Sequence, residues 1–370
     1  MNYPHPTLWI NGRLVSMDSI VHESANAYSP FEKHTFAFIR EWMVGEKTFL
    51  LQTSGSTGEP KQITVTREQM EASARLTEQA LELKKNDSAL VCIDTKYIGG
   101  KMMIVRCLTI GMRMWAVDPS SNPLSKIPID RCVNFAAFVP LQIQTILASK
   151  HPHSLNNLDT VIIGGASLDE KIIRQLDPYL CRCYATYGMT ETLSHVALRK
   201  LNSADKQPYF ELLPGMSAQP DGRGCLIVHV PYLKEPVVTN DLVDFKGPRQ
   251  FVWLGRWDNV INSGAVKVIP EKVEATVGNF FLKTGLTNRF FVHGVADTML
   301  GQKVVLFIEG TNCTEETLQR LLINLSEVLP PFETPREIRL IPFFEMTATG
   351  KINRLKTLER VPIIASIKKK

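Results

Sequence analysis

The sequence predicts an α/β fold: a large N-terminal domain of mostly parallel, layered sheets with a small antiparallel subdomain, and a small α+β C-terminal domain. Apolar strand-like runs alternate with helical segments between about residues 49 and 190, a pattern typical of parallel sheets covered on both faces. Short strands with turns replace this alternation from about 217 to 253. A break follows at 255–258, and the remaining residues have an alternation of their own. We therefore expect one domain over 1–256 and a second over 257–370.

The N-terminal elements can be predicted from their turn and capping residues. An Asn-Gly pair at the centre of 8–15 suits the two positive-φ positions of a tight turn, which predicts a hairpin. Ser29 as N-cap, a proline at the first helical position and Glu32 reaching back to the cap predict a helix that runs to about Met43.

Apolar runs and capping boxes predict the later elements. Thr66 with Gln69, and Ser167 with Glu170, have the spacing of a capping box. We expect strands at 49–51, 89–93, 114–117, 137–139, 161–163, 225–230, 250–254, 289–295 and 304–309, and helices near 67–83, 102–110, 270–280 and 314–328. Ligands of parallel sheets bind beyond the carboxyl ends of the strands, so we look for the site there.

Composition disfavours several classes of protein. The net charge of +5 is mild and no basic block is interleaved with aromatic residues, so nucleic acid is not a favoured partner. The N-terminal residues lack a signal-peptide pattern, and no apolar run approaches the roughly 18 to 20 residues that span a bilayer. We expect a cytoplasmic protein without membrane insertion. The seven cysteines are scattered, and Cys181-x-Cys183 lacks histidines at metal spacing, which favours buried, reduced thiols.

The most informative stretch is a run of hydroxyl and glycine residues that ends in a lysine. Glycines let backbone N–H groups approach a polyphosphate closely, the hydroxyls add donors, and Lys61 adds positive charge. The run is not a Walker loop, because Pro60 precedes the lysine. A flexible linker is the alternative, although a predicted strand and a predicted helix cap hold its two ends. The predicted phosphate-binding residues are Thr53, Ser54, Gly55, Ser56, Thr57, Gly58 and Lys61.

Three later segments carry other groups that a nucleotide needs. The run 187–191 offers an aromatic face for a base, a hydroxyl for a phosphate, and the Glu191 carboxylate for Mg²⁺, which takes only one or two protein carboxylates. Asp241 ends a strand and suits ribose hydroxyls, and a Gly-Lys pair lies at 350–351. Each has an ordinary alternative: Glu191 as a solvated residue, Asp241 as a turn cap, and the Gly-Lys pair as chance.

The order of these motifs is more specific than any one of them. The loop is followed by Gly-Gly-Ala, Tyr-Gly-Met-Thr-Glu, an aspartate, Gly-Arg-x-Asp and Gly-Lys. Over roughly residues 49–360 the chain resembles the adenylate-forming superfamily of acyl-CoA synthetases, luciferases and peptide-synthetase adenylation domains. The resemblance implies activation of a carboxylic acid by ATP and Mg²⁺ to an acyl-adenylate, and then transfer to coenzyme A. It also implies a mobile C-terminal domain that rotates between these two half-reactions.

The resemblance further implies a role for each matching residue. Residues 54–61 would bind the ATP phosphates, and Lys61, Thr190, Glu191 and Lys351 would form the catalytic set. The implied roles are adenine binding for Gly165, Ala166 and Tyr187 with Gly188 beside them, α-phosphate binding for Thr190, Mg²⁺ binding for Glu191, ribose binding for Asp241 and Arg256, the interdomain hinge for Asp258, and adenylation for Lys351.

The chain departs from the family pattern at several places. Asn240 stands where glycine is usual, Asn262 where lysine is common, and Ala265 where a second glycine often helps to form the thioester channel. Ala265 leaves the identity of the thiol acceptor open. The segment ahead of the phosphate loop is short, so we expect part of the first subdomain to be missing.

Compact members of this kind resemble o-succinylbenzoate:CoA ligases of menaquinone biosynthesis, whose substrate carries an aromatic ring and two carboxylates. The pocket should then supply apolar walls and one cation remote from the reacting carbon. We look for it along 94–106, where glycines and a helix start meet three basic residues. The candidates are Lys96, Tyr97, Gly100, Lys101 and Arg106, with Ser194 and His195 after the glutamate. Solvated cations and an uninvolved histidine remain alternatives.

The sequence therefore favours an acid:CoA ligase that takes a small aromatic carboxylic acid, ATP and coenzyme A. Another aryl or acyl adenylating enzyme, loading a carrier-protein thiol, is the first alternative. A nucleotide-binding protein without catalysis is the second, although the joint presence of Lys61, Glu191 and Lys351 argues against it. The oligomeric state is open, a homo-oligomer included.

Overall fold

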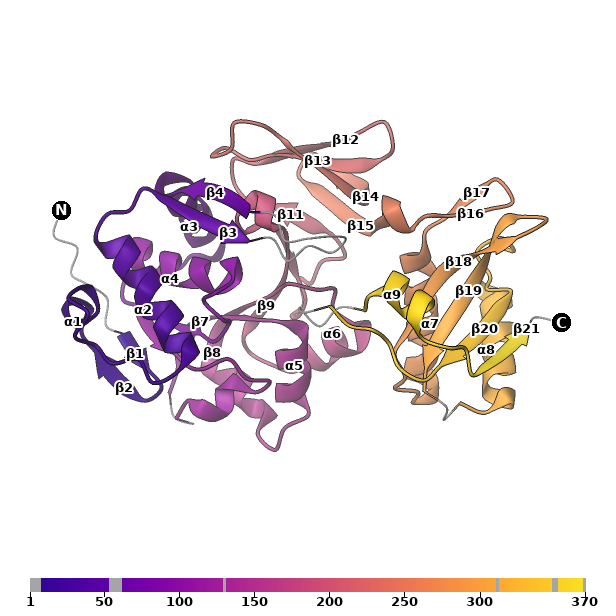
Figure 1. Ribbon diagram of the computed structural model, residues 1–370, viewed down its shortest axis with the longest axis horizontal. Coiled ribbons are helices and arrows are strands. Elements are labelled where there is room, and N and C mark those ends of the chain that lie inside the picture. Colours follow the sequence, from indigo (N-terminus) through magenta and orange to yellow (C-terminus); the bar gives the residue numbers. More distant parts are fainter. Residues whose placement is uncertain (1–7, 53–61, 129–130, 311–312, 348–351, 369–370) are drawn as a thin grey trace. The chain divides into compact units, whose positions relative to one another are not determined.

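The computed structural model describes residues 8–52, 62–128, 131–310, 313–347 and 352–368 (Figure 1). The chain divides into two compact units that are described separately below. The first unit comprises Met1–Ala218, Val228–Val237 and Phe245–Phe251, and the second comprises Gln219–Ile227, Val238–Asp244 and Val252–Lys370.

A twisted α/β sheet forms the centre of the first unit. Nine of the 13 strands of this sheet run in the order β11-β10-β9-β8-β7-β5-β6-β1-β2, and every pairing from β9 through β8, β7, β5 and β6 to β1 is parallel. These nine strands are β1 (Leu8–Ile10), β2 (Arg13–Val15), β5 (Ser88–Val91), β6 (Arg113–Ala116), β7 (Val133–Phe138), β8 (Leu158–Ile163), β9 (Arg182–Gly188), β10 (His195–Lys200) and β11 (Phe210–Leu212). The predicted parallel sheet is confirmed.

Helices cover this sheet, as expected for strands that are apolar throughout. The helices are α1 (Met17–Val21), α2 (Pro30–Met43), α3 (Arg67–Leu81), α4 (Ile98–Ile110), α5 (Pro140–Leu147) and α6 (Glu170–Leu176). Phe138, Ile143 and Leu176 belong to one core that joins the sheet to α5 and α6. Helix α4 packs on β5 and β6 and against α3. All four residues of β5 are buried, as in a strand covered on both faces.

Local signals predicted some of these elements well. Asn11 and Gly12 take the positive φ values of +48° and +83° that the predicted hairpin requires. Helix α2 begins and ends where predicted, with the Ser29 side chain accepting from the Glu32 N–H. The Glu32 carboxylate, however, accepts from the Tyr28 N–H at 2.7 Å and from Arg13, so it does not reach back to the cap residue.

Two other local predictions were wrong in part. Helix α6 is capped by Asp169, whose side chain accepts from the Lys171 N–H, and not by a box of Ser167 with Glu170. The predicted buried strand at 49–51 is one half of a two-stranded ribbon, β3 (Thr48–Gln52) with β4 (Gln62–Thr66). Leu50 is therefore exposed while its neighbours in β3 are buried.

Short strands connect the two units along the chain. They are β12 (Ser217–Pro220), β13 (Cys225–His229), β14 (Val237–Gly247) and β15 (Gln250–Arg256), and β13, β14 and β15 each contain residues of both units. This part matches the predicted change to short strands after residue 217.

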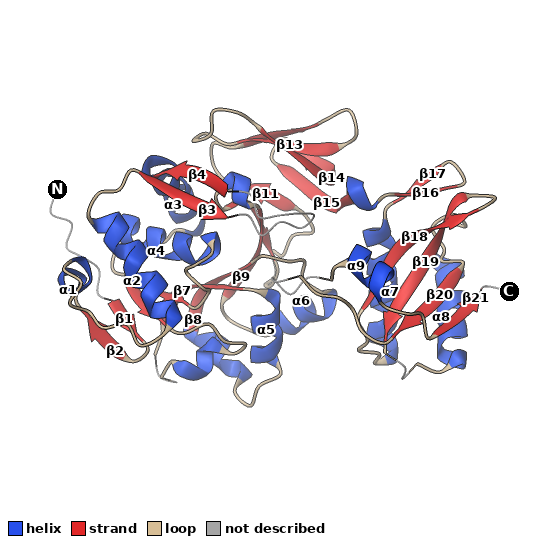
Figure 2. Ribbon diagram, in the orientation of Figure 1, coloured by secondary structure: helices blue, strands red, loops and turns tan. Residues whose placement is uncertain are grey.

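The second unit contains a sheet of its own with helices beside it (Figure 2). Its strands are β16 (Ile261–Ser263), β17 (Val266–Val268), β18 (Phe290–Asp297), β19 (Gly301–Glu309), β20 (Glu337–Ile341) and β21 (Ala365–Lys368), and its helices are α7 (Pro270–Thr284), α8 (Glu315–Val328) and α9 (Arg354–Arg360). Val277 and Leu321 join one core with α7 and α8, whereas Phe291, Phe307 and Val361 form a smaller second core. The predicted α+β character of this segment is confirmed.

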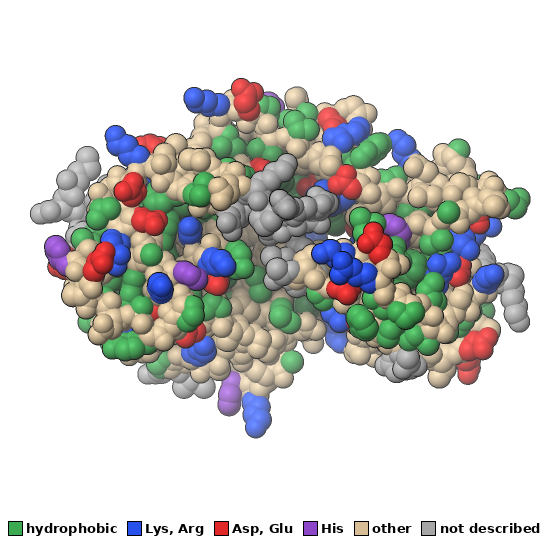
Figure 3. All heavy atoms as spheres, viewed as in Figure 1, with side chains coloured by type: hydrophobic (Ala, Val, Ile, Leu, Met, Phe, Trp, Pro, Cys, Tyr) green, Lys and Arg blue, Asp and Glu red, His purple; other side chains and the backbone are tan. Residues whose placement is uncertain are grey.

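Surface composition agrees with the mild net charge. On the face shown in Figure 3, Lys and Arg side chains are interspersed with Asp and Glu side chains. All seven cysteines are free thiols, and Cys132 is exposed, which corrects the expectation that all are buried. Among the helices that the structure describes, none combines the length and the apolar character that a membrane span requires.

Candidate active site

Two strand ends meet in the first unit where the sequence placed the adenine site. Strands β8 and β9 are parallel, with Ile163 opposite Ala185, so the residues that follow them lie at the same edge of the sheet. Gly164 makes the close packing possible, because a Cβ there would lie 2.2 Å from the Thr186 hydroxyl oxygen. Gly165, with φ of +88°, and Ala166 are exposed just beyond β8. A flat ligand can reach backbone at this edge.

Tyr187 is held by two phenylalanines. Its ring centroid lies 5.8 Å from that of Phe210 and 5.2 Å from that of Phe251, the latter at an interplanar angle of 81°. Phe251 is fully buried and Tyr187 is half-buried. The ring is thus fixed from behind, and such a fixed aromatic can stack with a planar base.

A tight turn follows Gly188 and presents Thr190 and Glu191. Gly188 pairs with His195 across β9 and β10, and a Cβ on it would lie 2.4 Å from the Ser194 carbonyl oxygen. The Thr192 hydroxyl bridges the two sides of the turn, since it lies 3.0 Å from the Met189 nitrogen and 2.7 Å from the Ser194 oxygen. The buried Thr192 therefore leaves Thr190 half-buried and Glu191 exposed for a ligand.

Behind this turn lies a buried arginine. Arg106 of α4 is 2% exposed, and its Nη2 donates to the Ser194 hydroxyl at 2.6 Å and lies 3.5 Å from His195 Nδ1. Its Nε donates to the Thr77 hydroxyl at 3.3 Å. Within the described part of the chain, no carboxylate forms an ion pair with it. A buried cation with neutral partners only is a candidate anion site.

Arg106 and His195 differ in their protonation states at neutral pH. Burial lowers the pKa of Arg106 to about 10, so the guanidinium is still charged at neutral pH. Burial, and then the Arg106 charge, hold the pKa of His195 well below its ordinary value. His195 is thus neutral beside a cation, and it can accept or donate a hydrogen bond without competing for the charge.

The other predicted pocket residues lie at or near the start of α4. Gly100 is buried, and a Cβ on it would lie 2.5 Å from the Asp94 carbonyl oxygen. The Lys101 ammonium lies 5.3 Å from the Phe38 ring centroid, and burial lowers the pKa of this lysine. Lys96 and Tyr97 are exposed. The structure therefore brings Ser194 and His195 to Arg106, and places Lys101 against α2.

The predicted ribose and hinge residues meet in the second unit. Arg256 Nη2 donates to Asp258 Oδ2 at 2.7 Å, and its Nη1 lies 3.8 Å from Asp241 Oδ1. The Trp253 indole N–H donates to Asp241 Oδ1 at 3.1 Å. Asp258 lies in a single turn of 3-10 helix, η4 (Trp257–Asn259).

Sequence reasoning missed some residues that support the site. The Tyr232 hydroxyl donates to the Thr192 carbonyl at 3.0 Å, and the Gln69 side chain donates to the Tyr232 carbonyl at 3.2 Å. Tyr232 lies 40 residues from Thr192, and Trp253 reaches back 12 residues to Asp241, so no local signal identified either contact. Ala265, one of the departures noted above, takes a φ of +66°, a value that favours glycine.

The predicted phosphate loop (Thr53 to Lys61) and Lys351 lie outside the described residues. Among the residues that are described, no group of three or more His, Cys, Asp or Glu side chains could hold a metal ion. Glu191 is an exposed oxygen donor, and a single carboxylate with phosphates and water is a suitable set for Mg²⁺.

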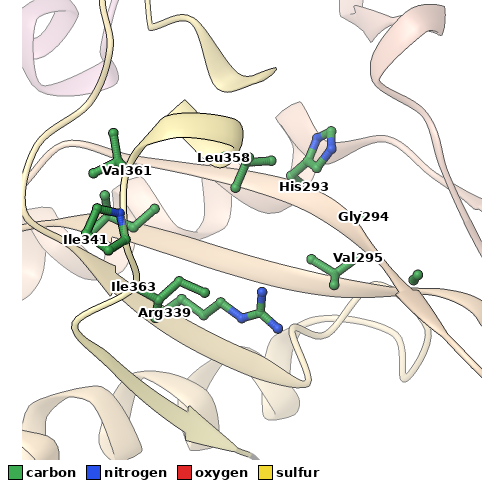
Figure 4. Close-up of a pocket in the computed structure, with 10 residues that line it drawn as sticks. His293, Gly294, Val295, Arg339, Ile341, Leu358, Val361 and Ile363 are labelled. Atoms are coloured by element: carbon green, nitrogen blue, oxygen red, sulfur yellow. The ribbon is translucent and has the colours of Figure 1, made fainter. Parts of the chain in front are cut away.

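A separate hollow of about 500 Å³ lies in the second unit, between α9 and its sheet (Figure 4). Most of its lining is apolar, including Ile341, Leu358 and Val361. Arg339 also lines it, but its guanidinium donates to Glu337 at 2.7 Å and is already paired. The hollow holds none of the predicted site residues.

Several known proteins are similar to this chain. The AMP-binding enzyme family matches residues 38–216. A 2-succinylbenzoate–CoA ligase of Lactococcus lactis is 24% identical over 325 residues, which cover 82% of this chain and 69% of that protein. The solved O-succinylbenzoate coenzyme A synthetase of Bacillus subtilis, in complex with ATP and magnesium ion, is 19% identical with a TM-score of 0.71, over 83% of this chain and 69% of that one. This last likeness concerns the fold.

A solved acyl-CoA synthetase (AMP-forming)/AMP-acid ligase II-like protein from Dyadobacter fermentans is more similar in sequence. It is 36% identical with a TM-score of 0.62, and the match covers 92% of this chain and 97% of that one. A match of this identity over nearly both full lengths settles the family. The chain therefore belongs to the AMP-binding enzyme family and is an AMP-forming acid–thiol ligase.

Proposed function

We propose that the protein converts o-succinylbenzoate to an acyl-adenylate and then to o-succinylbenzoyl-CoA, in the cytoplasm and as a step of menaquinone biosynthesis. The observation that carries the choice of acid is Arg106, a buried cation that contacts Ser194 and His195 and has no acidic partner among the described residues. The name of the Lactococcus relative supports the same substrate.

The nucleotide would be held by the residues that the resemblance to the family assigns to it. Tyr187 would stack on adenine beside Gly165, Ala166 and Gly188, and Thr190 would donate to the α-phosphate. Asp241 and Arg256 would bind the ribose. The residues from Thr53 to Gly58 and Lys61 would hold the β- and γ-phosphates. Mg²⁺, held by Glu191 and the phosphates, would reduce the electrostatic repulsion between the carboxylate of the acid and the phosphates of ATP.

In the first half-reaction a carboxylate oxygen of the acid attacks the α-phosphorus, and the bond from that phosphorus to pyrophosphate breaks. Lys61 and Lys351 would stabilise the charge that develops on the phosphate oxygens. In the second, the sulfur of coenzyme A attacks the acyl carbon, its proton leaves to solvent, and AMP departs with the electron pair of the broken C–O bond.

The second carboxylate of the acid would explain why Arg106 is buried without an acidic partner among the described residues. An isolated carboxylate is costly to bury, and a guanidinium with further hydrogen-bond donors offsets that cost. Arg106, with the Ser194 hydroxyl and the neutral His195 ring, provides such a set behind the turn that carries Thr190. Tyr97, Gly100, Lys96 and Lys101 would border the same pocket from the start of α4.

A carrier-protein thiol is the second candidate acceptor. Ala265 keeps this alternative open, because a methyl group at a positive-φ position stands where the family pattern has glycine. The channel for the pantetheine arm would then differ from the usual one.

Acid-dependent exchange between ATP and pyrophosphate tests the proposal. The panel should contain o-succinylbenzoate, benzoate, simple aryl acids and medium-chain fatty acids, each with and without coenzyme A. Exchange that is selective for o-succinylbenzoate, followed by thioester formation with coenzyme A, is the expected result. Selective exchange with a different acid would overturn the substrate, and an adenylate that only a carrier protein can accept would overturn coenzyme A.

A further inference from the structure

The Asp258 carboxylate is bonded on both oxygens by different side chains. Asn240 Nδ2 donates to Oδ1 at 2.9 Å, and Arg256 Nη2 donates to Oδ2 at 2.7 Å. All three residues belong to the second unit. Because both oxygens are engaged, the orientation of the Asp258 side chain is fixed relative to β14 and β15.

Asn240 is itself held from its other end. Arg223 Nη1 donates to Asn240 Oδ1 at 2.9 Å, and Arg223 Nη2 donates to the Thr239 carbonyl at 3.2 Å. Arg223 is anchored in turn by Asp221, whose carboxylate accepts from its Nε at 2.8 Å and from its backbone N–H. The Asn240 amide is therefore a rigid bridge between the turn before β13 and the turn that contains Asp258.

The backbone at Asp258 is a single turn whose flanking residues have partners of their own, since Asn259 donates to Glu271 at 2.6 Å and the Lys267 ammonium lies 4.4 Å from the Trp257 ring centroid. The turn η4 is closed by the Val260 N–H, which donates to the Trp257 carbonyl at 3.2 Å. The Asp258 side chain is 41% exposed. A change of φ and ψ at this residue would carry its carboxylate away from at least one of its two partners.

Arg256 and Asn240 differ in what else they do. Arg256 also lies 3.8 Å from Asp241, so ribose binding would engage it as well. Asn240 bonds only Arg223 and Asp258 among the contacts that the structure gives it. A substitution of Asn240 therefore perturbs the turn more specifically than a substitution of Arg256 does.

We propose that Asn240 is a positioning residue that latches the Asp258 turn, and so sets how readily the C-terminal residues change orientation between the two half-reactions. This inference rests on the proposed function, because Asp258 is the hinge only in that scheme. Loss of the amide leaves the chemistry of both half-reactions intact and changes the balance between the orientations that serve them.

Hydrogen–deuterium exchange of the full chain tests the latch without catalysis. The Val260 amide in a peptide covering 257–262 reports opening of the turn. We expect exchange about two- to tenfold faster in Asn240→Ala, the range that one net hydrogen bond gives. Asn240→Asp has the same shape, keeps an acceptor for Arg223 and repels Asp258, so it should be at least as fast.

Asn134→Ala is the matched control. Asn134 also bridges two residues, because its Oδ1 accepts from the Ser88 N–H at 2.8 Å and its Nδ2 donates to Asp159 at 2.6 Å, but it lies in β7 of the first unit. Exchange at 257–262 should match the wild type in this variant. Wild-type exchange in Asn240→Asp would overturn the latch.

The second readout is the ratio of the two half-reactions, measured as pyrophosphate exchange and as thioester formation from preformed acyl-adenylate. Asn240→Ala should change this ratio by at least twofold, whereas a residue with a merely structural role would lower both rates together. Equal loss in both would also overturn the latch. If the wild-type protein shows no pyrophosphate exchange with any acid of the panel, the proposed function is overturned. The deuterium-exchange result would not be affected.

Discussion

Arg106 and His195 lie next to each other in the first unit, and each has a property that can be measured separately. For Arg106 that property is its charge. Arg106→Met keeps a long aliphatic side chain but removes the cation. We therefore expect kcat/KM for o-succinylbenzoate to fall about 10- to 100-fold, the range of one charged hydrogen bond. The KM for ATP should change less than about twofold.

Arg106→Lys separates charge from shape, and we expect an intermediate loss because lysine cannot donate to Ser194 and a carboxylate in the same planar way. Steady-state pyrophosphate exchange with varied acid measures both variants. Unchanged kcat/KM for the acid in Arg106→Met would remove this residue from the substrate pocket.

His195 should make stability depend on pH. Its pKa is lowered well below 6.5 by burial and by Arg106, so it stays neutral in the folded state and takes up a proton on unfolding below pH 6.5. The unfolded state then binds more protons, and stability falls as the pH drops through 6.5. The slope from this residue is at most about 1.4 kcal/mol per pH unit.

Urea unfolding at several pH values between 5 and 7.5 measures that slope. His195→Gln should flatten it between pH 6.5 and 5, whereas His151→Gln, at an exposed position, should leave it unchanged. An equal slope in His195→Gln and the wild type would contradict the argument. Other shifted groups, such as His293 with its lowered pKa and Glu274 with its raised pKa, contribute equally to both proteins, so the difference between the two slopes isolates His195.

Part of the site was predictable at this scale and part was not. Tyr187, Thr190 and Glu191 belong to one short motif, so their spacing was enough to predict that they lie together. The contact between Arg106 and Ser194 joins residues 88 positions apart, and only tertiary packing reveals it. The phosphate loop and Lys351 lie outside the described residues, and their roles remain predictions.

Helix α4 offers a comparison between two neighbouring glycines. A Cβ on Gly99 would meet only the Ile93 side chain at 3.7 Å, an ordinary contact, whereas a Cβ on Gly100 would lie 2.5 and 2.6 Å from two backbone oxygens. Gly99→Ala should stabilise the fold by up to about 1 kcal/mol through helix propensity. Gly100→Ala should destabilise it by about 1 to 3 kcal/mol through overpacking.

Urea denaturation of the two variants checks this pair. Because the chemical change is the same and the positions are adjacent, the difference between them isolates the close approach of α4 to the end of β5. Similar stabilities in both variants would show that the backbone at Asp94 yields, and would weaken the case for a rigid pocket wall there.

Most helices and strands could be predicted because their signals are local. Helix α3 has the predicted capping box, with Thr66 and Gln69 bonded in both directions. Glu32 and Asp169 show the limit. A capping spacing was present at both helix starts, but the tertiary partners of Glu32 and the Asx turn at Asp169 prevailed over it. The ribbon partner β4 was missed because it follows the loop without an apolar run of its own.

At the scale of the whole molecule, the segment 257–370 carries the sheet from β16 to β21 with a core on each side. We expect this fragment to fold alone and to unfold in one cooperative thermal transition. By the usual value per residue, its unfolding enthalpy near 60 °C should be about 80 kcal/mol.

Calorimetry and circular dichroism of the isolated fragment measure this. Leu321→Asp, at a fully buried position of α8, should abolish the transition, whereas Ile323→Asp, 59% exposed on the same helix, should preserve it. A fragment without a transition would show that residues before 257 are required. The boundary at 256 would then need to move toward the N-terminus.

The division into units also shows why domain limits are hard to predict. A linear boundary at 256 assumes that the chain leaves one unit once. The structure places 219–227 and 238–244 in the second unit, while 228–237 belongs to the first, so the chain passes between them several times. No change of composition marks these passages, because they occur inside regular strands.

Because the Trp253 indole donates to Asp241, the intrinsic fluorescence of this tryptophan can report nucleotide binding. Ribose hydroxyls that bind Asp241 would share its carboxylate with the indole N–H, so the fluorescence emission of Trp253 should change. Trp257 lies in the turn that contains Asp258 and would report movement of that turn, so Trp253→Phe and Trp257→Phe would separate the two signals from the background of the other three tryptophans. Stopped-flow mixing with ATP alone could then time nucleotide arrival before any bond is broken, and separate it from the chemistry that follows.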